Sequence, residues 1–219
     1  LGMLDNQGVI INSNFQRFTY NMNIRRSGWG DKVKILSKSN ASYKKGNSAS
    51  VGNGQIFQQR SVVSQALQFQ PIFGLLELGE DDDIYADLNE GNIVSNPYTL
   101  ASFVEDRKEA FTLLQSLSVV ANLGSNLTAS LKGSANYQRS TRDNYYPTNT
   151  TRGRRNNGEA TQSFLQNLKI YGEASLQYKR AFKGGHRLNA IAVGTVEHND
   201  IRSMYNKAFG FGTDLTSFY

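Results

Sequence analysis

The sequence predicts an all-β fold, an antiparallel meander of long strands that forms a segment of a large transmembrane β-barrel. The first observation is alternation: across 127–138, apolar or small residues occupy every second position and polar residues the positions between. Such a strand has one dry face and one wet face. The second is length, because soluble strands usually have about five or six residues, whereas strands that cross a bilayer at a tilt need about nine to eleven. The third is the alternation of short and long connections.

The same pattern marks the other expected strands. In chain order we expect strands at 18–24, 32–44, 111–119, 127–138, 164–179 and 187–199. Leu36 interrupts the second of them, and both faces of the last hold small or apolar residues. Aromatic residues on the expected dry faces suit the interfacial girdles of membrane barrels. They are Tyr20, Tyr43, Phe111, Tyr137, Phe164 and Tyr178.

The connections indicate the topology. Segments 27–31, 122–126 and 182–186 are short and rich in Gly or Asn, as hairpin turns require. We expect them on the periplasmic side. The longer polar segments at roughly 46–106, 144–163 and from 206 onward would then be extracellular. Within the first of these, residues 58–70 are predicted to form a short helix that ends at Pro71.

Composition limits the class of protein. A mean hydropathy of -0.50, with no apolar stretch near twenty residues, excludes helical membrane spans but not barrels, in which every second residue is polar. The absence of cysteine excludes disulfides and thiolate metal sites. The chain begins at Leu1 without a signal-peptide pattern, so either a signal peptide has been removed or the chain begins inside a longer protein. We favour the second interpretation.

No catalytic constellation is recognisable. His186 falls in an expected turn and His198 near an expected strand end, and neither has a nucleophile or a ligand set at fixed spacing. We therefore expect no enzyme activity, no cofactor and no metal site.

Two charged runs lie in the expected loops. Glu80-Asp81-Asp82-Asp83, with Asp87 and Glu90 beyond it, could hold calcium, but consecutive acids do not match the alternating ligands of an EF-hand loop. A solvated charge run is the favoured interpretation. Arg152-Gly153-Arg154-Arg155 could meet lipid phosphates or an anionic ligand, and solvent exposure is the ordinary alternative.

Five short motifs follow one another along the chain. They are Gly8-Val9-Ile10-Ile11, Phe15-Gln16-Arg17-Phe18, Tyr20-Asn21-Met22-Asn23, Val62-Val63-Ser64-Gln65-Ala66-Leu67 followed by Pro71, and Asn96-Pro97-Tyr98. With these motifs in this order, the chain resembles the TonB-dependent outer-membrane transporters, and within them the SusC/RagA-like branch. The resemblance covers nearly all of 1–219, taken as one partial barrel domain from the middle of such a transporter. No plug domain or TonB box is recognisable, and about six strands are expected where plugged barrels have about twenty-two. A complete eight-stranded barrel is the structural rival, because Phe218-Tyr219 is similar to the aromatic terminus of outer-membrane proteins.

The resemblance implies energised uptake of glycans or peptides across the cell outer membrane, with no bond broken. It also implies the partners: outer-membrane lipid, a SusD-like surface lipoprotein, the TonB complex acting through the missing plug, and a glycan or peptide substrate. The rival of another class is a secreted β-sandwich adhesin or glycan-binding module, which would be water-soluble with shorter strands. Loop aromatics are the candidate substrate-binding residues, because their rings stack on sugars and peptide side chains, with ordinary loop packing as the alternative. They are Tyr85, Tyr98, Tyr145 and Tyr146.

The net charge of +6 requires an interpretation of its own. A nucleic-acid-binding protein concentrates Lys and Arg on one patch with aromatic platforms between them. Here the lysines fall on the wet faces of several expected strands, so we expect no nucleic-acid partner. The residues are Lys32, Lys34, Lys38, Lys132, Lys169 and Lys179. In a barrel these faces line the lumen or meet the plug, and a basic lumen would either attract anionic solutes or pair with acidic plug residues.

Overall fold

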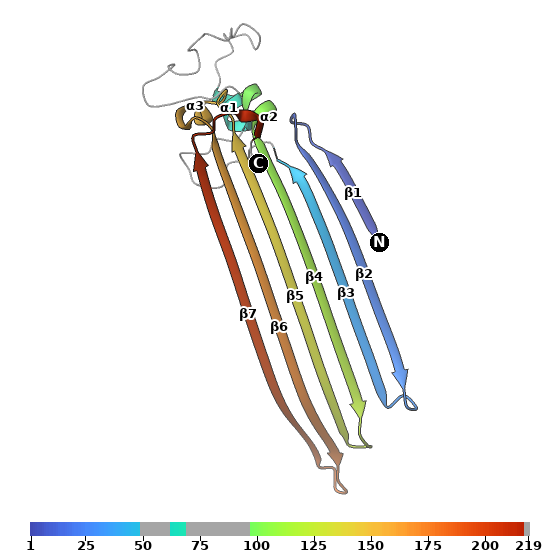
Figure 1. The fold of residues 1–219 in the computed structure, drawn as a ribbon. Helices are drawn as coiled ribbons and strands as arrows, with labels where there is room; N and C mark the ends of the chain where they lie inside the picture. The colour runs from blue at the N-terminus through green and yellow to red at the C-terminus, as the bar shows by residue number, and fades with distance from the viewer. Residues whose placement is uncertain (49–61, 69–96, 217–219) are drawn as a thin grey trace.

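The structure, a computed structural model, describes residues 1–48, 62–68 and 97–216. Within them the chain forms one 7-stranded antiparallel sheet in which every strand pairs with the next (Figure 1). The strands are β1 (Gly2–Gln7), β2 (Asn14–Gly28), β3 (Val33–Asn47), β4 (Glu105–Asn122), β5 (Leu127–Tyr146), β6 (Glu159–Ala181) and β7 (Arg187–Phe209). The predicted antiparallel meander of long strands is confirmed.

The strands extend further than the sequence pattern predicted, and one was missed. β4 begins at Glu105, β5 continues to Tyr146 and β7 to Phe209, so parts of the expected loops are strand. β1 was not expected because its Met3 and Leu4 are adjacent, which breaks the alternation. It forms on the free edge of β2, with Met3 opposite Phe18. The number of described strands is therefore seven, where about six were expected.

The three short connections are tight turns at one end of the sheet, called here the turn end (Figure 1). In the β2–β3 turn, Trp29, Gly30 and Asp31 all have left-handed backbone angles, with φ of 51°, 63° and 62°. The β6–β7 turn is closed by Phe182, whose N–H donates to the carbonyl of His186 at 2.9 Å. The predicted hairpin positions are confirmed, and the longer connections lie at the opposite, loop end.

The register places the predicted apolar residues on one face. Leu131 of β5 lies opposite Ala174 of β6 and Val119 of β4, and residues directly opposite in an antiparallel pair point to the same side. The same holds for Ala129 with Leu176 and for Ala135 with Ile170. We call this the apolar face, and the face that carries Lys132 and Glu173 the polar face. The predicted facing of the strands is confirmed.

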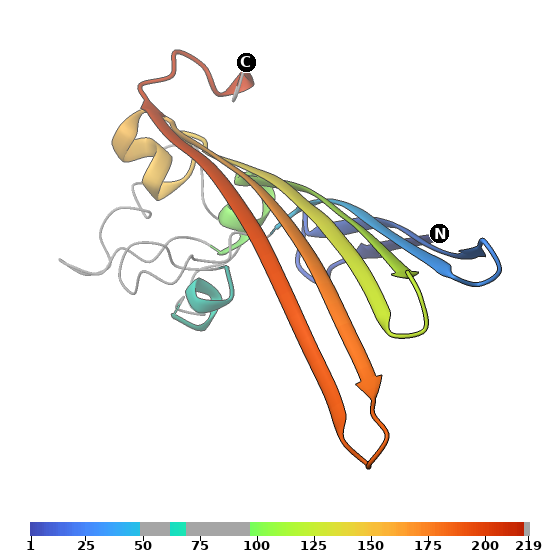
Figure 2. The same cartoon turned by 90° about the horizontal axis from the view of Figure 1, so that it is seen from below.

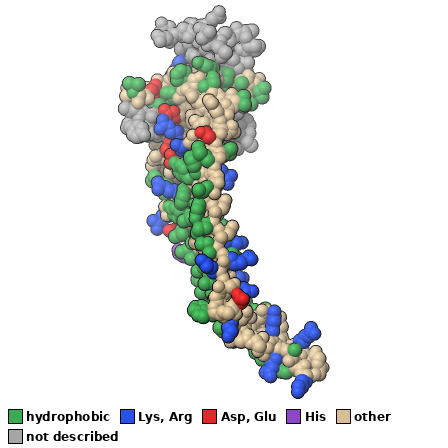
Figure 3. All heavy atoms as spheres, turned by 90° about the vertical axis from the view of Figure 1, so that its right-hand side faces the viewer, with side chains coloured by type: hydrophobic (Ala, Val, Ile, Leu, Met, Phe, Trp, Pro, Cys, Tyr) green, Lys and Arg blue, Asp and Glu red, His purple; other side chains and the backbone are tan. Residues whose placement is uncertain are grey.

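The apolar face is uncovered over its whole breadth. Figure 3 shows hydrophobic side chains in a continuous band along the sheet. The apolar run of β5, residues 127–137, spans about 33 Å along the strand at about 3.3 Å per residue. With the tilt of about 40° found in membrane barrels this becomes roughly 25 Å, the height of the lipid-facing band of such barrels.

Short helices gather at the loop end, and Figure 2 shows the twisted sheet running away from them. They are α1 (Val62–Gln68), α2 (Pro97–Phe103), α3 (Thr151–Asn156) and the 3-10 turn η2 (Asp214–Thr216). α1 lies inside the predicted helix at 58–70, whose remaining residues are outside the described part of the chain. α2 and α3 were not expected. None of the described helices is long and apolar enough to cross a membrane.

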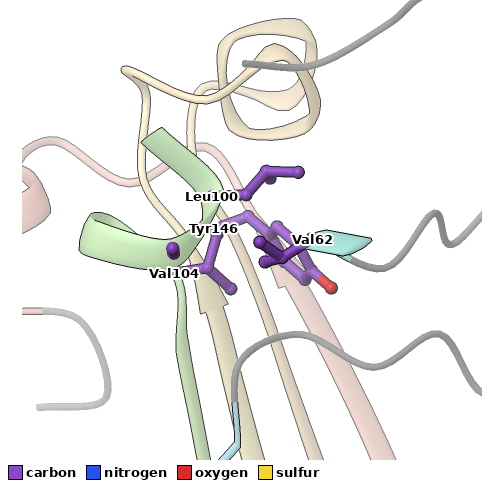
Figure 4. Packing of buried hydrophobic residues seen from close by; sticks show 5 residues of the cluster. Val62, Leu100, Val104 and Tyr146 are labelled. Carbon is purple, nitrogen blue, oxygen red and sulfur yellow. The ribbon is translucent and has the colours of Figure 1, made fainter. Parts of the chain in front are cut away.

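A small hydrophobic core lies at the loop end rather than on the sheet. Figure 4 shows Val62 of α1, Leu100 of α2, Val104 and Tyr146 of β5 converging on one another, and Ile10 packs against this cluster. A β-sandwich buries the inner face of one sheet against a second sheet. The described residues instead form a single sheet whose apolar face stays open, which is the architecture of a barrel segment.

Candidate functional site

The loop end carries three of the four predicted substrate-binding residues, Tyr98, Tyr145 and Tyr146. Hydrogen bonds between distant segments fix its shape. The turn between β1 and β2 reaches α2 through Asn12, whose amide donates to the carbonyls of Ala101 at 3.2 Å and Ser102 at 2.8 Å. Asn12 has a φ of 59°, a left-handed conformation that asparagine adopts more readily than most residues. These bonds satisfy carbonyls near the C-terminus of α2 that have no partner within the helix.

A second set of bonds joins the loop ends of the central strands. The carboxylate of Asp106 in β4 is buried and accepts two parallel bonds from Arg142 of β5, at 2.7 Å from Nε and 2.8 Å from the second terminal nitrogen. Lys108 lies 3.5 Å from the same carboxylate. A buried carboxylate is stable only when it is paired and hydrogen-bonded, and this geometry meets both conditions.

The arginine-rich run forms α3, which is anchored over the sheet. The side chain of Thr150 accepts a bond from the N–H of Gly153 at 3.0 Å and caps the helix, and Asn157 ends it in a left-handed conformation. A side chain at Gly153 would collide with the carbonyl of Pro147, so only glycine permits this close approach. The Thr150 cap and the Asn157-Gly158 ending are sequence signals from which α3 could have been predicted.

Arg152 is not the solvent-facing residue expected from the run as a whole. Its guanidinium stacks over the ring of Tyr146, 4.2 Å from the ring centre, and pairs with the buried carboxylate of Glu159. Lys207 of β7 approaches the same carboxylate to 3.0 Å, and Asn156 donates to it at 2.7 Å. Arg154 and Arg155 are exposed, as the solvent-facing interpretation of the arginine run predicted.

The segment after β7 is fastened to the end of β5 by Asp214. Its carboxylate accepts bonds from the hydroxyl of Tyr145 at 2.6 Å, from the hydroxyl of Thr148 and from the N–H of Thr148. Burial by itself raises the pKa of Asp214, but the hydrogen bonds from Thr148 and Tyr145 outweigh it and hold that pKa below its ordinary value. Phe211 meets the ring of Tyr145 edge-on, with 5.3 Å between the ring centres.

The candidate substrate-binding tyrosines lie in different environments. Tyr98 of α2 is 48% exposed, whereas Tyr145 and Tyr146 at the end of β5 are 2% and 8% exposed. Phe211 and Arg152 occupy the sides of those two buried rings. Tyr85 lies outside the described residues. The role of these four tyrosines in substrate binding stays a prediction, and Tyr98 is the most exposed of the three that the structure describes.

The other chemical candidates are placed as follows. The acidic run at 80–83, with Asp87 and Glu90, lies outside the described residues. His186 lies in the β6–β7 turn, as expected, but His198 lies in the middle of β7, opposite Ile170, and not near a strand end. β7 continues past residue 199 through residues that do not alternate between polar and apolar, which is why its end was misjudged. In the described part of the chain, His, Asp and Glu side chains form no cluster of three that could hold a metal ion.

Comparison with known proteins identifies the fold. No protein-family model matches the chain, and no curated protein matches it. The structure is similar to the RagAB peptide importer in its open-open state, with a TM-score of 0.66 and 13% identity over 92% of this chain. It is also similar to the closed-closed state, with a TM-score of 0.60 and 14% identity over 91% of this chain.

A further structure of the RagAB peptide transporter gives the same TM-score of 0.60 at 14% identity. In each comparison the chain spans 22% of the transporter chain it matches. Because the sequence identity is so low, the similarity shows the fold alone. The seven strands are arranged like a segment of these transporter chains. The similarity agrees with the resemblance to the SusC/RagA-like branch that the sequence motifs indicated.

Proposed function

We propose that this chain is part of the barrel of a SusC-like, TonB-dependent importer in the outer membrane. The observation that carries the proposal is the open apolar face, which has the height of a lipid-facing band and belongs to a sheet with the fold of a RagAB segment. Large exposed apolar surfaces mark contacts with membranes or proteins. Lipid outside the barrel would cover the apolar face of this sheet, and the polar face would then line the barrel interior.

In this role the chain supplies part of the barrel wall and a surface that binds substrate, and it supplies no catalytic group. The loop end carries α1, α2 and α3, so substrate would first meet these elements on the extracellular side. A SusD-like surface lipoprotein would deliver the substrate there, and the TonB complex would act through a plug outside residues 1–219. Peptides and glycans are the proposed substrate classes. Peptides are supported by the similar solved structures, which are those of a peptide importer, and glycans by the resemblance of the sequence motifs to the SusC/RagA-like branch.

The test uses the full-length protein in its own cells. Deleting the gene is expected to abolish uptake of fluorescent oligopeptides or oligoglycans, and collapsing the proton gradient in wild-type cells should have the same effect. Outer-membrane fractionation and a heat-modifiable band on gels would verify a folded barrel. Recovery of the full-length protein in the soluble fraction, or undiminished uptake of every peptide and glycan tested after the deletion, would refute the proposal.

A further inference from the structure

Acidic side chains on the polar face of β4 to β7 are held in ion pairs. Lys132 lies 2.8 Å from Glu173, and Lys169 lies 2.7 Å from Glu197. Nearer the loop end the acids Asp106 and Glu159 are held by cations as well, as described above. Every acidic residue at a polar-face position of these four strands therefore has a basic partner within the sheet.

The polar face of β2 and β3 is different, because it carries cations without acids. Its basic residues are called here the basic strip. They are Arg17, Arg25, Lys34, Lys38 and Lys44. No Asp or Glu occupies a polar-face position of β1, β2 or β3, and no member of the strip makes an ion pair within the part of the chain that the structure describes.

The cations of the basic strip repel one another, because no acidic side chain lies between them on the polar face of β2 and β3. Arg17 lies directly opposite Lys44 in the register, and like charges opposite each other on neighbouring strands destabilise the pair. From Lys34 to Lys44 the strip extends about 33 Å along β3, at about 3.3 Å per residue. Between the cations lie the amides of Asn21 and Asn40, which bond to each other. A partner with carboxylates spread over a similar length would relieve the repulsion.

We propose that the basic strip is the docking surface for an acidic polypeptide face, contributed by a part of the full-length transporter outside residues 1–219. The inference rests on the proposed function, because the polar face lies inside only if the sheet is a barrel wall. Charge complementarity identifies the partner: a face rich in Asp and Glu would gain charge-assisted bonds, bidentate at the two arginines. A small anion is a poorer fit, since it requires donors that converge on one point, whereas these cations are distributed along the strands.

Zero-length carboxyl–amine cross-linking of the full-length protein in outer-membrane vesicles, followed by mass spectrometry, tests the proposal. Lys34, Lys38 and Lys44 are expected to cross-link to Asp or Glu residues outside 1–219. Lys132 is the internal standard, because its expected cross-link is to Glu173. Cross-links from the strip to the acids at 80–90 would overturn the assignment to another part of the protein.

Charge reversal provides the matched variants. K38E should remove the cross-link formed by residue 38 and make the partner segment more sensitive to protease, and reversing the acid cross-linked to Lys38 should restore resistance. K179E, a polar-face cation on β6 outside the strip, should leave both measurements unchanged.

The outcomes separate this inference from the proposed function. If the full-length protein is a heat-modifiable barrel but the strip forms no cross-links, and K38E alters only the conductance for inorganic phosphate, then the strip serves small anions and the docking inference is wrong. If the protein is not a membrane barrel, the proposed function and the docking inference fall together.

Discussion

Lys132 of β5 and Glu173 of β6 lie directly opposite each other, with 2.8 Å between the ammonium nitrogen and a carboxylate oxygen. The preceding residue, Leu131, points to the other side of the same strand and is 59% exposed. One step along β5 thus separates an ion pair on the polar face from an uncovered apolar side chain. This contrast allows the two environments to be tested at adjacent positions.

Replacing Leu131 with Arg in the full-length protein should impair membrane insertion, at a cost of about 2 to 4 kcal/mol for a cation near the bilayer midplane. L176R should behave similarly, because Leu176 lies on the same face. The measurement is the fraction of protein in the folded, heat-modifiable band. K132Q is the control, since its side chain lies on the polar face, and it should leave assembly nearly unchanged. Equal yields of folded protein for L131R and K132Q would show that the facing assignment is wrong.

Asp214 should make the attachment of the segment after β7 dependent on pH. Its pKa is held below the ordinary 3.8, so this contribution to stability is complete above that value and is lost as pH falls through the lower folded-state pKa. Protonation removes the charge that accepts the bonds from Tyr145 and Thr148. The protection factor of the Thr148 N–H, which is its exchange rate relative to the intrinsic rate at the same pH, should therefore be high at pH 6 and fall once the pH drops below the folded-state pKa. D214N should exchange faster at pH 6 and lose the acid-induced change, and an unaltered profile would contradict the role of the carboxylate.

The faces of the strands were predictable from sequence because alternation has a period of exactly two residues. Once Leu131 and Ile170 are assigned to the dry side, the side of every neighbour in their strands follows. The strand ends were not predictable on this basis. Beyond the lipid-facing band a strand needs no apolar side, so polar residues such as Asp143 and Asn144 continue β5 without any alternation.

The loop end was less predictable because its contacts join residues far apart in the chain. Tyr145 and Asp214 are 69 positions apart, and nothing in the local sequence of either residue indicates the bond. Neighbouring Tyr145 and Tyr146 look like a pair of exposed loop aromatics, yet they are the end of a strand and point to opposite sides. Asn12 likewise bonds to α2, which lies in the long β3–β4 connection, over a separation of 90 positions.

Tyr98 is the candidate substrate-binding residue that the structure leaves exposed, so its substitution separates binding from folding. Y98A in the full-length transporter should reduce uptake while surface abundance stays normal, because the exposed ring can stack on a sugar or a peptide side chain. Y145F is the matched comparison, since it removes only the hydroxyl that bonds Asp214 and should affect the attachment of the segment after β7 more than uptake. Normal uptake by Y98A at normal abundance would remove this residue from the binding site.

The isolated chain should not form a stable soluble protein. Among the residues that the structure describes, its sheet has two unpaired edges, at β1 and β7, and an apolar face on which Leu131, Ile170 and Leu176 are all exposed. In lipid, each unpaired backbone N–H or C=O of an edge costs several kcal/mol because no water is present to bond it. In water, the same edges and apolar face favour association with other chains. Residues 1–219 expressed alone should therefore aggregate or require detergent, and should conduct no ions across a planar bilayer. Sedimentation and channel recording measure both properties, and a soluble, monomeric, well-folded chain would overturn the barrel interpretation.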